Sequence, residues 1–290
     1  MTGRALEVLD PGPLATTQDL GRPGLMSLGV PRSGAADRDS LRLANRLVGN
    51  PEGIVAVEAT FGGLRVRAHG ALTVALTGAA APARRNDRRV AHNSVVRLAD
   101  GDVLSLGAPE AGARTYLAVR GGLRTDLALG SGATDLLSGL GPPPLAAGAM
   151  LAVGTTPLDL PAIDLAPVPR TGGGTIELPV TWGPRADWLT PRSRADLLAT
   201  SWTVTSASNR IGLRLAGPAL EPAVERELPS EGLLEGAIQV PREGQPILFL
   251  ADHPVTGGYP VVVVVDALAI PAAGQAVPGQ QVRFRLAAQV

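Results

Sequence analysis

Residues 251–265 read Ala-Asp-His-Pro-Val-Thr-Gly-Gly-Tyr-Pro-Val-Val-Val-Val-Val. The pattern of a turn followed by a short apolar run recurs along the chain and predicts its fold class. A turn rich in glycine and proline leads into Val261–Val265, a run of β-branched residues that favours a strand. This run is the longest purely aliphatic stretch in the sequence. It is much shorter than the about 20 residues that a membrane-spanning helix requires, so we expect a buried strand and no insertion into a membrane.

Short apolar runs of the same kind recur between glycine and proline residues, and they predict further strands. These runs occupy residues 55–59, 72–76, 103–106, 116–119, 176–180, 247–250 and 282–286. Helical periodicity is convincing only at residues 36–48 and 190–199, where Thr190 and Pro191 suit a helix start. The sequence therefore predicts a mainly β fold, with barrels or sandwiches and a few short helices.

The length of the chain predicts two domains, because 290 residues are about twice the size of a common domain. Residues 154–174 contain four prolines and end on three consecutive glycines, a composition that suits a linker better than a buried element. We place the boundary in this stretch, with one module at residues 1–165 and a second at residues 166–290.

The charged residues exclude several classes of function. All 26 lysine or arginine positions are arginines, and 26 acidic residues balance them, so no basic field is available for nucleic acid or an anionic membrane. Without lysine the chain carries no biotinyl-lysine and forms no Schiff base, and without cysteine it has no thiol nucleophile or disulfide. The first residues lack a secretory h-region, so we expect a cytoplasmic protein.

Two loops with arginine are candidates for binding a polar ligand. Arg32, Ser33 and Asp37 precede the first helix, where an anion can be held by a guanidinium and helical N–H groups. The alternative is that Ser33 caps the helix while Asp37 complements its dipole. Asn209 and Arg210 form a planar amide and guanidinium pair that suits an amide, lactam or carboxylate; the alternative is a simple turn with a solvated arginine.

The second half of the chain holds further candidates at Glu231, at Gln239 and in the turn that contains Thr256, Gly257, Gly258 and Tyr259. Paired glycines let backbone N–H groups approach a ligand, although a tight hairpin without a ligand is the alternative. The turn is not a Walker A loop, which requires a lysine. The three histidines are scattered, so we expect no metal held by the protein.

Seven stretches in fixed order carry a resemblance that spans nearly the whole chain. They include Gln-Asp-Leu-Gly-Arg-Pro-Gly at 18–24 and Ala-Asn-Arg-Leu-Val-Gly-Asn at 44–50, and the others lie at 29–37, 209–212, 230–232, 236–241 and 256–260. Together they resemble the KipA-type family, also called allophanate hydrolase subunit 2. Its members include one of the subunits of prokaryotic 5-oxoprolinase and the later part of the carboxyltransferase region of urea carboxylase.

The resemblance implies two cyclophilin-like β-barrel modules and a hetero-oligomer with a KipI-type partner, the allophanate hydrolase subunit 1 protein. It also implies a third, lactam-opening subunit and the use of ATP, with or without Mg²⁺, to open 5-oxoproline to glutamate. On this hypothesis Asn209 and Arg210 orient the substrate, and Glu231 is the acid or base. The expected substrate- or nucleotide-binding residues are Arg32, Ser33, Asp37, Gln239, Thr256, Gly257, Gly258 and Tyr259.

Two other functions stay open at this point. The chain would act as a carboxyltransferase subunit if a separate protein delivered carboxylated biotin to urea or a related amide. It would act as a non-catalytic regulatory partner if it bound a KipI-type inhibitor of a sensor histidine kinase.

Overall fold

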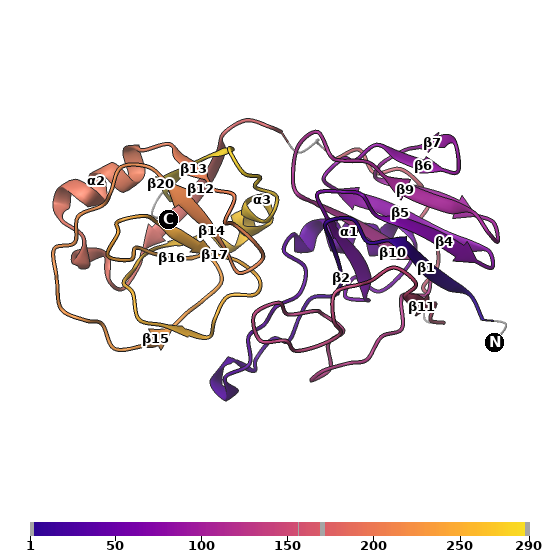
Figure 1. The fold of residues 1–290 in the computed structure, drawn as a ribbon, viewed down its shortest axis with the longest axis horizontal. Helices are drawn as coiled ribbons and strands as arrows, with labels where there is room; N and C mark the ends of the chain where they lie inside the picture. Colours follow the sequence, from indigo (N-terminus) through magenta and orange to yellow (C-terminus); the bar gives the residue numbers. More distant parts are fainter. Residues whose placement is uncertain (1–2, 156, 169–171, 288–290) are drawn as a thin grey trace. The chain divides into compact units, whose positions relative to one another are not determined.

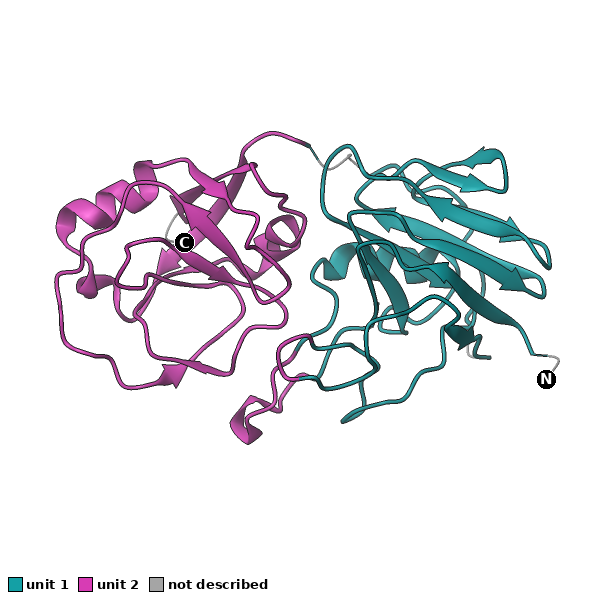
Figure 2. Cartoon of the chain, viewed as in Figure 1, with its two compact units in different colours: residues 1–22, 33–135, 139–172 teal, residues 23–32, 136–138, 173–290 magenta. Residues whose placement is uncertain are grey.

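The computed structural model describes residues 3–155, 157–168 and 172–287, and its chain divides into two compact units (Figures 1 and 2). Unit 1 comprises residues 1–22, 33–135 and 139–172, and unit 2 comprises residues 23–32, 136–138 and 173–290. No local sequence pattern indicates that the two short segments belong with the second unit. A domain boundary after residue 165 stays a prediction, because compactness alone does not show that either part folds by itself.

Unit 1 is built from two sheets and one helix. Its six-stranded sheet has the order β11-β1-β4-β9-β6-β7, and its five-stranded sheet has the order β2-β3-β10-β5-β8. The strands are β1 (Ala5–Asp10), β2 (Leu14–Gln18), β3 (Ala56–Thr60), β4 (Arg65–His69), β5 (Leu72–Gly78), β6 (Ala83–Arg85), β7 (Arg88–Val90), β8 (Ser94–Leu98), β9 (Val103–Leu106), β10 (Arg114–Val119) and β11 (Met150–Ala152).

The alternation of side chains along β5 explains how unit 1 is layered. Val74 and Leu76 belong to the core between the two sheets, whereas Ala75 faces a second cluster with helix α1 (Arg38–Leu47). A small residue at this position lets the helix approach the sheet closely. The five-stranded sheet is therefore covered on both faces, and every residue of β3 and β10 is buried.

Unit 2 contains a closed barrel with the strand order β12-β19-β16-β17-β14-β13-β20. The barrel closes through the parallel pairing of its first and last strands, in which Leu178 faces Phe284. The barrel strands are β12 (Ile176–Trp182), β13 (Trp202–Val204), β14 (Gly212–Ala216), β16 (Ala237–Gln239), β17 (Ile247–Phe249), β19 (Val261–Val265) and β20 (Gln281–Leu286). A short ribbon of β15 (Glu231–Gly232) and β18 (Thr256–Gly257) lies outside this ring of hydrogen bonds.

The helices are few and short, as predicted. Besides α1, the described residues form α2 (Pro191–Ala199), α3 (Ile270–Gly274) and three single 3₁₀ turns, η1 (Met26–Leu28), η2 (Ala186–Trp188) and η3 (Ala267–Ala269). Thr190 caps α2 by accepting a hydrogen bond from the Ser193 N–H. The expected mainly β fold is confirmed, and the predicted barrel closure is seen in unit 2, whereas the strands of unit 1 form two separate sheets.

Candidate functional site

A pocket of about 800 Å³ in unit 2 brings together residues from distant parts of the sequence. Apolar side chains and three prolines form one part of its lining, and charged side chains form another. The lining residues are Trp188, Leu189, Leu220, Pro222, Val224, Glu225, Arg226, Glu227, Leu228, Val240, Pro241, Arg242, Gly258, Tyr259 and Pro260. This combination of an apolar surface with a few polar groups is typical of small-molecule sites.

Tyr259 and Gly258 are the predicted site residues that reach this pocket. Gln239 holds their turn, because its side-chain Nε2 donates a hydrogen bond of 2.7 Å to the Tyr259 carbonyl. The Tyr259 side chain stays 46% exposed and is free to contact a ligand. Gln239 itself is buried, so its role in this geometry is to position the turn.

Gly257 is closely packed in this turn. A Cβ atom on Gly257 would lie 2.7 Å from Leu233 Cδ1 and 2.8 Å from Gln239 Nε2, so a larger residue would require these two side chains to shift. Gly257 pairs with Glu231 in the β15–β18 ribbon, next to the exposed Thr256. Neither Gly257 nor Gly258 has the left-handed backbone that forms a phosphate-binding nest. Their geometry therefore does not match a phosphate cradle.

Glu231 forms an ion pair with Arg185, which sequence reasoning missed. The guanidinium donates from Nε to both carboxylate oxygens at 3.1 Å, and from Nη2 to Oε1. The hydrogen bonds from Arg185 lower the pKa of Glu231 below its ordinary value. The side chain is therefore ionised at neutral pH, and its role as an acid or base stays a prediction.

Two aromatic residues, Trp188 and Tyr259, line the pocket of unit 2. The guanidinium of Arg226 lies 5.5 Å from the ring centroid of Trp188, which is a cation–π contact. Trp188 is buried, whereas the second aromatic residue of the lining, Tyr259, is exposed. The chain has three tryptophans, and this rarity is the one signal in the sequence that points to Trp188.

Asn209 and Arg210 lie next to each other in sequence but have separate structural roles. The Asn209 side-chain oxygen accepts a hydrogen bond from the Ile211 N–H at 2.8 Å and so forms a turn with its own backbone. Arg210 is 1% exposed and forms a two-pronged ion pair with Asp252, with distances of 2.8 Å (Nε to Oδ2) and 2.9 Å (Nη2 to Oδ1). The catalytic roles of both residues stay predictions, while the geometry gives them a structural role.

The loop before α1 is held by a buried polar network in unit 1. Asp37, and not Ser33, is the N-cap residue, since its side chain accepts a hydrogen bond from the Ser40 N–H. Ser33 is buried with a left-handed φ of 52°, and its hydroxyl donates to the Thr134 carbonyl at 3.2 Å. Arg32 is half-buried and belongs to unit 2. The anion-binding role of the three predicted residues is not tested by this geometry.

The Tyr116 hydroxyl completes this network. It donates to Glu58 Oε2 at 2.7 Å and accepts a hydrogen bond from the Asp37 N–H at 2.8 Å. Burial, together with the nearby Glu58 carboxylate, raises the pKa of Tyr116 well above its ordinary value. The hydroxyl therefore stays protonated and fixes the start of α1.

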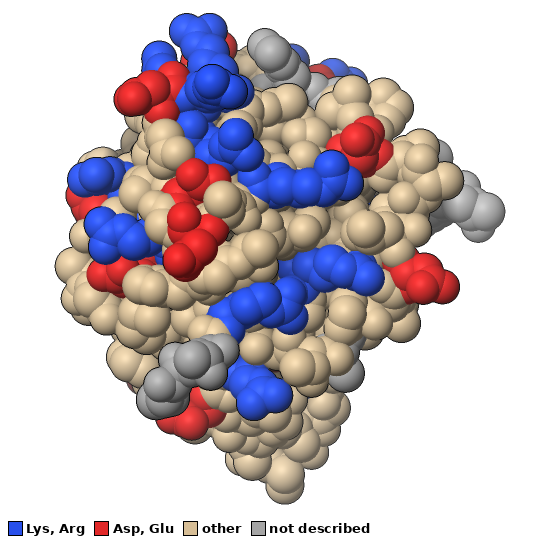
Figure 3. All heavy atoms as spheres, turned by 90° about the vertical axis from the view of Figure 1, so that its right-hand side faces the viewer, with Lys and Arg blue, Asp and Glu red and all other residues tan. Residues whose placement is uncertain are grey.

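Several classes of site are absent from the part of the chain that the structure describes. No group of three or more histidine or acidic residues there is arranged to hold a metal ion. No helix there is both long and apolar enough to span a bilayer. On the face of unit 1 seen in Figure 3, arginine side chains lie beside acidic ones, so that face does not present a field of one sign.

Comparisons with known proteins place the whole chain in context. It matches the family described as carboxyltransferase domain, subdomain A and B, over residues 28–286. It is 36% identical over 266 residues to a 5-oxoprolinase subunit of Escherichia coli (strain K12), covering 90% of this chain and 85% of that protein. It is 33% identical to urea amidolyase of Lachancea kluyveri, covering 97% of this chain and 17% of the relative.

The fold is similar to that of a solved structure. The crystal structure of TTHA0988 in space group P212121 matches with a TM-score of 0.88 and 32% sequence identity. The match covers 97% of this chain and 55% of that chain, so this chain spans about half the length of TTHA0988. The chain belongs to the family of carboxyltransferase domains that comprise subdomains A and B.

Proposed function

We propose that this chain is a subunit of an ATP-dependent 5-oxoprolinase, which opens the lactam of 5-oxoproline to L-glutamate. The proposal rests on the 36% identity with a 5-oxoprolinase subunit of Escherichia coli, a relative that this chain covers over 85% of its length. That relative is named as one subunit of its enzyme, which supports a multi-subunit complex. In this proposal a KipI-type protein and a third, lactam-opening subunit are the partners.

The pocket of unit 2 suits a small lactam in size and chemistry. Its volume of about 800 Å³ lies within the usual range for small-molecule sites. The Trp188 and Leu220 side chains offer an apolar surface to the methylene groups of the ring. Arg242 has 67% of its side chain exposed, and its guanidinium lies 3.6 Å from the carboxylate of Glu227. The substrate carboxylate would displace this exposed partner and bind the guanidinium. Tyr259 would contact the lactam group.

Lactam opening needs activation, because resonance makes the amide carbon a poor electrophile. When the carbonyl oxygen attacks the terminal phosphorus of ATP, ADP departs and the oxygen becomes part of a leaving group. Water then adds to the carbon, the C–N bond breaks with the proton going to the amine, and a second water releases phosphate to give glutamate. In this scheme ATP is consumed as a co-substrate.

We assign ATP to another subunit in this proposal. Gly257 and Gly258 lack the backbone conformation of a phosphate-binding nest. On this reading the chain contributes to binding and orienting the lactam, and the ion pair of Glu231 with Arg185 stiffens the ribbon next to the pocket.

Reconstitution tests the proposal directly. The chain is purified with its KipI-type partner and the third subunit, and ATP-dependent release of glutamate from 5-oxoproline is measured with and without each component. We expect release only when all are present, and no release in any combination would refute the assignment.

Matched arginine variants test the pocket within that assay. Loss of one charge-assisted contact in Arg242→Gln should raise KM for 5-oxoproline about tenfold. The control is Arg283→Gln on β20, an exposed arginine outside the pocket, which should leave KM unchanged. Equal KM values for the two variants would remove Arg242 from the substrate site.

A biotin-dependent carboxyltransferase is the second candidate function. It is favoured by the family description and by the 33% identity with urea amidolyase over 97% of this chain. Because the chain has no lysine, biotin would arrive on a separate carrier protein. A complex supplied with biotin carboxylase, carrier and urea would form a carboxylated product in this case, and none from 5-oxoproline. No observation favours the regulatory role.

A further inference from the structure

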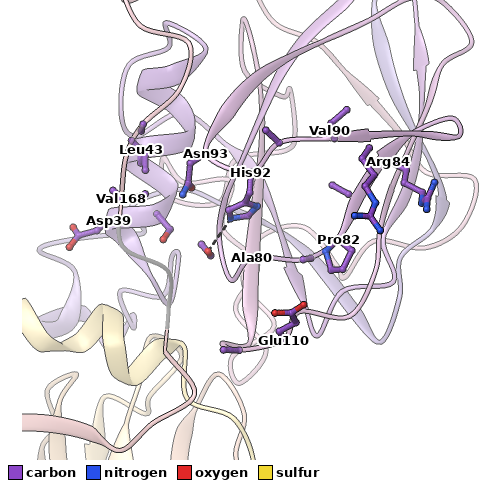
Figure 4. A pocket seen from close by; sticks show the side chains of 18 of the residues that line it. Asp39, Leu43, Ala80, Pro82, Arg84, Val90, His92, Asn93, Glu110 and Val168 are labelled. Carbon is purple, nitrogen blue, oxygen red and sulfur yellow. Dashed lines mark hydrogen bonds between the residues drawn. The ribbon is translucent and has the colours of Figure 1, made fainter.

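A second cavity, of about 860 Å³, lies within unit 1 and shares no residue with the pocket of unit 2 (Figure 4). Helix α1, the β6–β7 hairpin and the turn that follows β5 form its walls. Leu43, Pro82 and Val90 make part of the lining apolar, and His92 and Glu110 bring polar groups toward the same space (Figure 4). The volume suits a small organic molecule.

The β6–β7 hairpin carries an unusual concentration of positive charge. Arg84 lies directly opposite Arg89 in the strand register, and both line the cavity. Like charges in such a cross-strand pair repel each other. Arg84 donates one hydrogen bond, to the Asp87 carbonyl in the turn, whereas Arg89 has no hydrogen bond or ion pair with another described residue. An anion placed between the two guanidinium groups would relieve this repulsion.

Other charges of the lining are already compensated from outside the cavity. Asp39 forms an ion pair with Arg42 at 3.2 Å, and Arg46 forms one with Glu52 at 3.1 Å. Glu110 has no ion pair with a described residue. Arg84 and Arg89 carry two positive charges and Glu110 carries one negative charge, so the lining has a net charge of +1. This net charge suits a monoanion better than a dianionic phosphate.

The base of the cavity supplies hydrogen-bonding groups. His92 Nε2 lies 3.0 Å from the Gly78 carbonyl, so this nitrogen carries a proton and donates to it. The neighbouring Asn93 has a left-handed φ of 54°, and its side-chain oxygen is buried with no hydrogen-bond donor among the described residues. A buried acceptor of this kind favours a ligand that carries an N–H or O–H group.

We propose that this cavity is a binding site for a small organic monocarboxylate whose apolar body carries an N–H or O–H donor. The carboxylate lies between Arg84 and Arg89, and the apolar body contacts Leu43, Pro82 and Val90. The site is separate from the proposed lactam pocket and does not depend on the activity proposed for the chain.

Calorimetric titration of the full chain tests the site. The probes are 4-hydroxybenzoate, 4-hydroxyphenylacetate and 3-hydroxy-3-methylbutanoate, each compared with its primary amide, and inorganic phosphate. We expect at least one carboxylate to bind, its amide to bind about tenfold more weakly or not at all, and phosphate to bind more weakly than the carboxylate.

Two arginines of the same hairpin provide the variant and its control. Arg89→Gln should raise the Kd of the bound carboxylate about tenfold, because one charge-assisted contact is lost. Arg88→Gln removes the same charge from a residue that faces Arg85 in the register and does not line the cavity, so its Kd should stay that of the parent chain. Absence of binding by every carboxylate, equal binding of acid and amide, tighter binding of phosphate or equal effects of the two variants would each overturn the proposal.

Discussion

The buried pair of Arg210 and Asp252 changes what a mutation at Arg210 is expected to do. Both side chains are almost completely inaccessible, at 1% and 0% exposure, and they share two hydrogen bonds. Arg210→Ala would leave the Asp252 carboxylate buried without its guanidinium, so we expect the free energy of unfolding to fall by about 3–5 kcal/mol. Urea denaturation of the full chain, followed by circular dichroism, measures this loss.

An exposed pair in the same unit is the control for this variant. Arg192 and Asp196 lie 3.6 Å apart on the surface of α2, with 88% and 47% of their side chains exposed. Arg192→Ala should change the free energy of unfolding by less than about 0.5 kcal/mol, since water screens this pair. If Arg210→Ala abolished turnover in a reconstituted complex while stability stayed unchanged, Arg210 would instead be a substrate-binding residue.

Glu231 should titrate at unusually low pH because of Arg185. Hydrogen bonds from the guanidinium lower the pKa of this carboxyl below 4.5, and the lowered pKa of the folded state stabilises the fold above the unfolded-state value. This contribution is complete above about pH 4.5 and is lost as the pH falls through the lowered pKa. Carboxyl ¹³C NMR should report a midpoint below 4.5.

The matched variant for this titration is Arg185→Gln. It removes the charge and most of the hydrogen bonding, so the Glu231 midpoint should return toward 4.5. An unchanged Glu231 midpoint in Arg185→Gln would contradict the ion pair.

The tight turn at residues 128–131 holds a leucine in a conformation that suits glycine or asparagine. Two hydrogen bonds between Ala128 and Ser131 close a two-residue turn, in which Leu129 has φ 53°. A left-handed backbone costs a residue such as leucine about 1–2 kcal/mol. Because Leu129 is 59% exposed, Leu129→Asn loses little burial and should raise the free energy of unfolding by about 0.5–1 kcal/mol.

The neighbouring Leu127 allows a matched comparison in denaturant unfolding. It is 63% exposed and does not have a positive φ. Leu127→Asn should therefore change stability by less than about 0.5 kcal/mol. Equal effects of the two asparagine substitutions would show that the backbone conformation of Leu129 carries no strain.

Local sequence patterns predicted the elements well because those patterns act over a few residues. Thr190 followed by Pro191 marks the start of α2. The hydrogen bond from the Ser193 N–H to the Thr190 hydroxyl confirms that Thr190 caps the helix. The valine run Val261–Val265 forms β19. Strand order was not predictable, since the parallel pairing of β12 with β20 joins segments that are about a hundred residues apart in sequence.

The candidate site was less predictable than the fold, because it depends on partners that are remote in sequence. Nothing near Arg210 indicates that Asp252 lies 42 residues further on and neutralises it. The same holds for Glu231 and Arg185, separated by 46 residues. Gly258 and Tyr259 drew attention because a glycine pair followed by a tyrosine is a local signal. Both line the pocket of unit 2, and their binding role stays a prediction.

Each hydrophobic core of the molecule consists of residues from a single unit. Leu76 belongs to the core between the sheets of unit 1, and Leu178 belongs to the barrel core of unit 2. Both side chains are fully buried. Truncation of a buried leucine to alanine costs about 2–5 kcal/mol, because transfer free energy is lost and a cavity remains. Each truncation should therefore weaken the unit that contains it.

Hydrogen exchange measured by mass spectrometry tests this expectation with two reciprocal variants. In Leu178→Ala, amides of β12, β19 and β20 should lose protection equivalent to about 2–5 kcal/mol, while amides of β5 and β10 keep theirs. In Leu76→Ala the pattern should be reversed. If either substitution lowered protection equally in both sets of strands, the two units would unfold as one cooperative body, and separate cores would not imply separate stabilities.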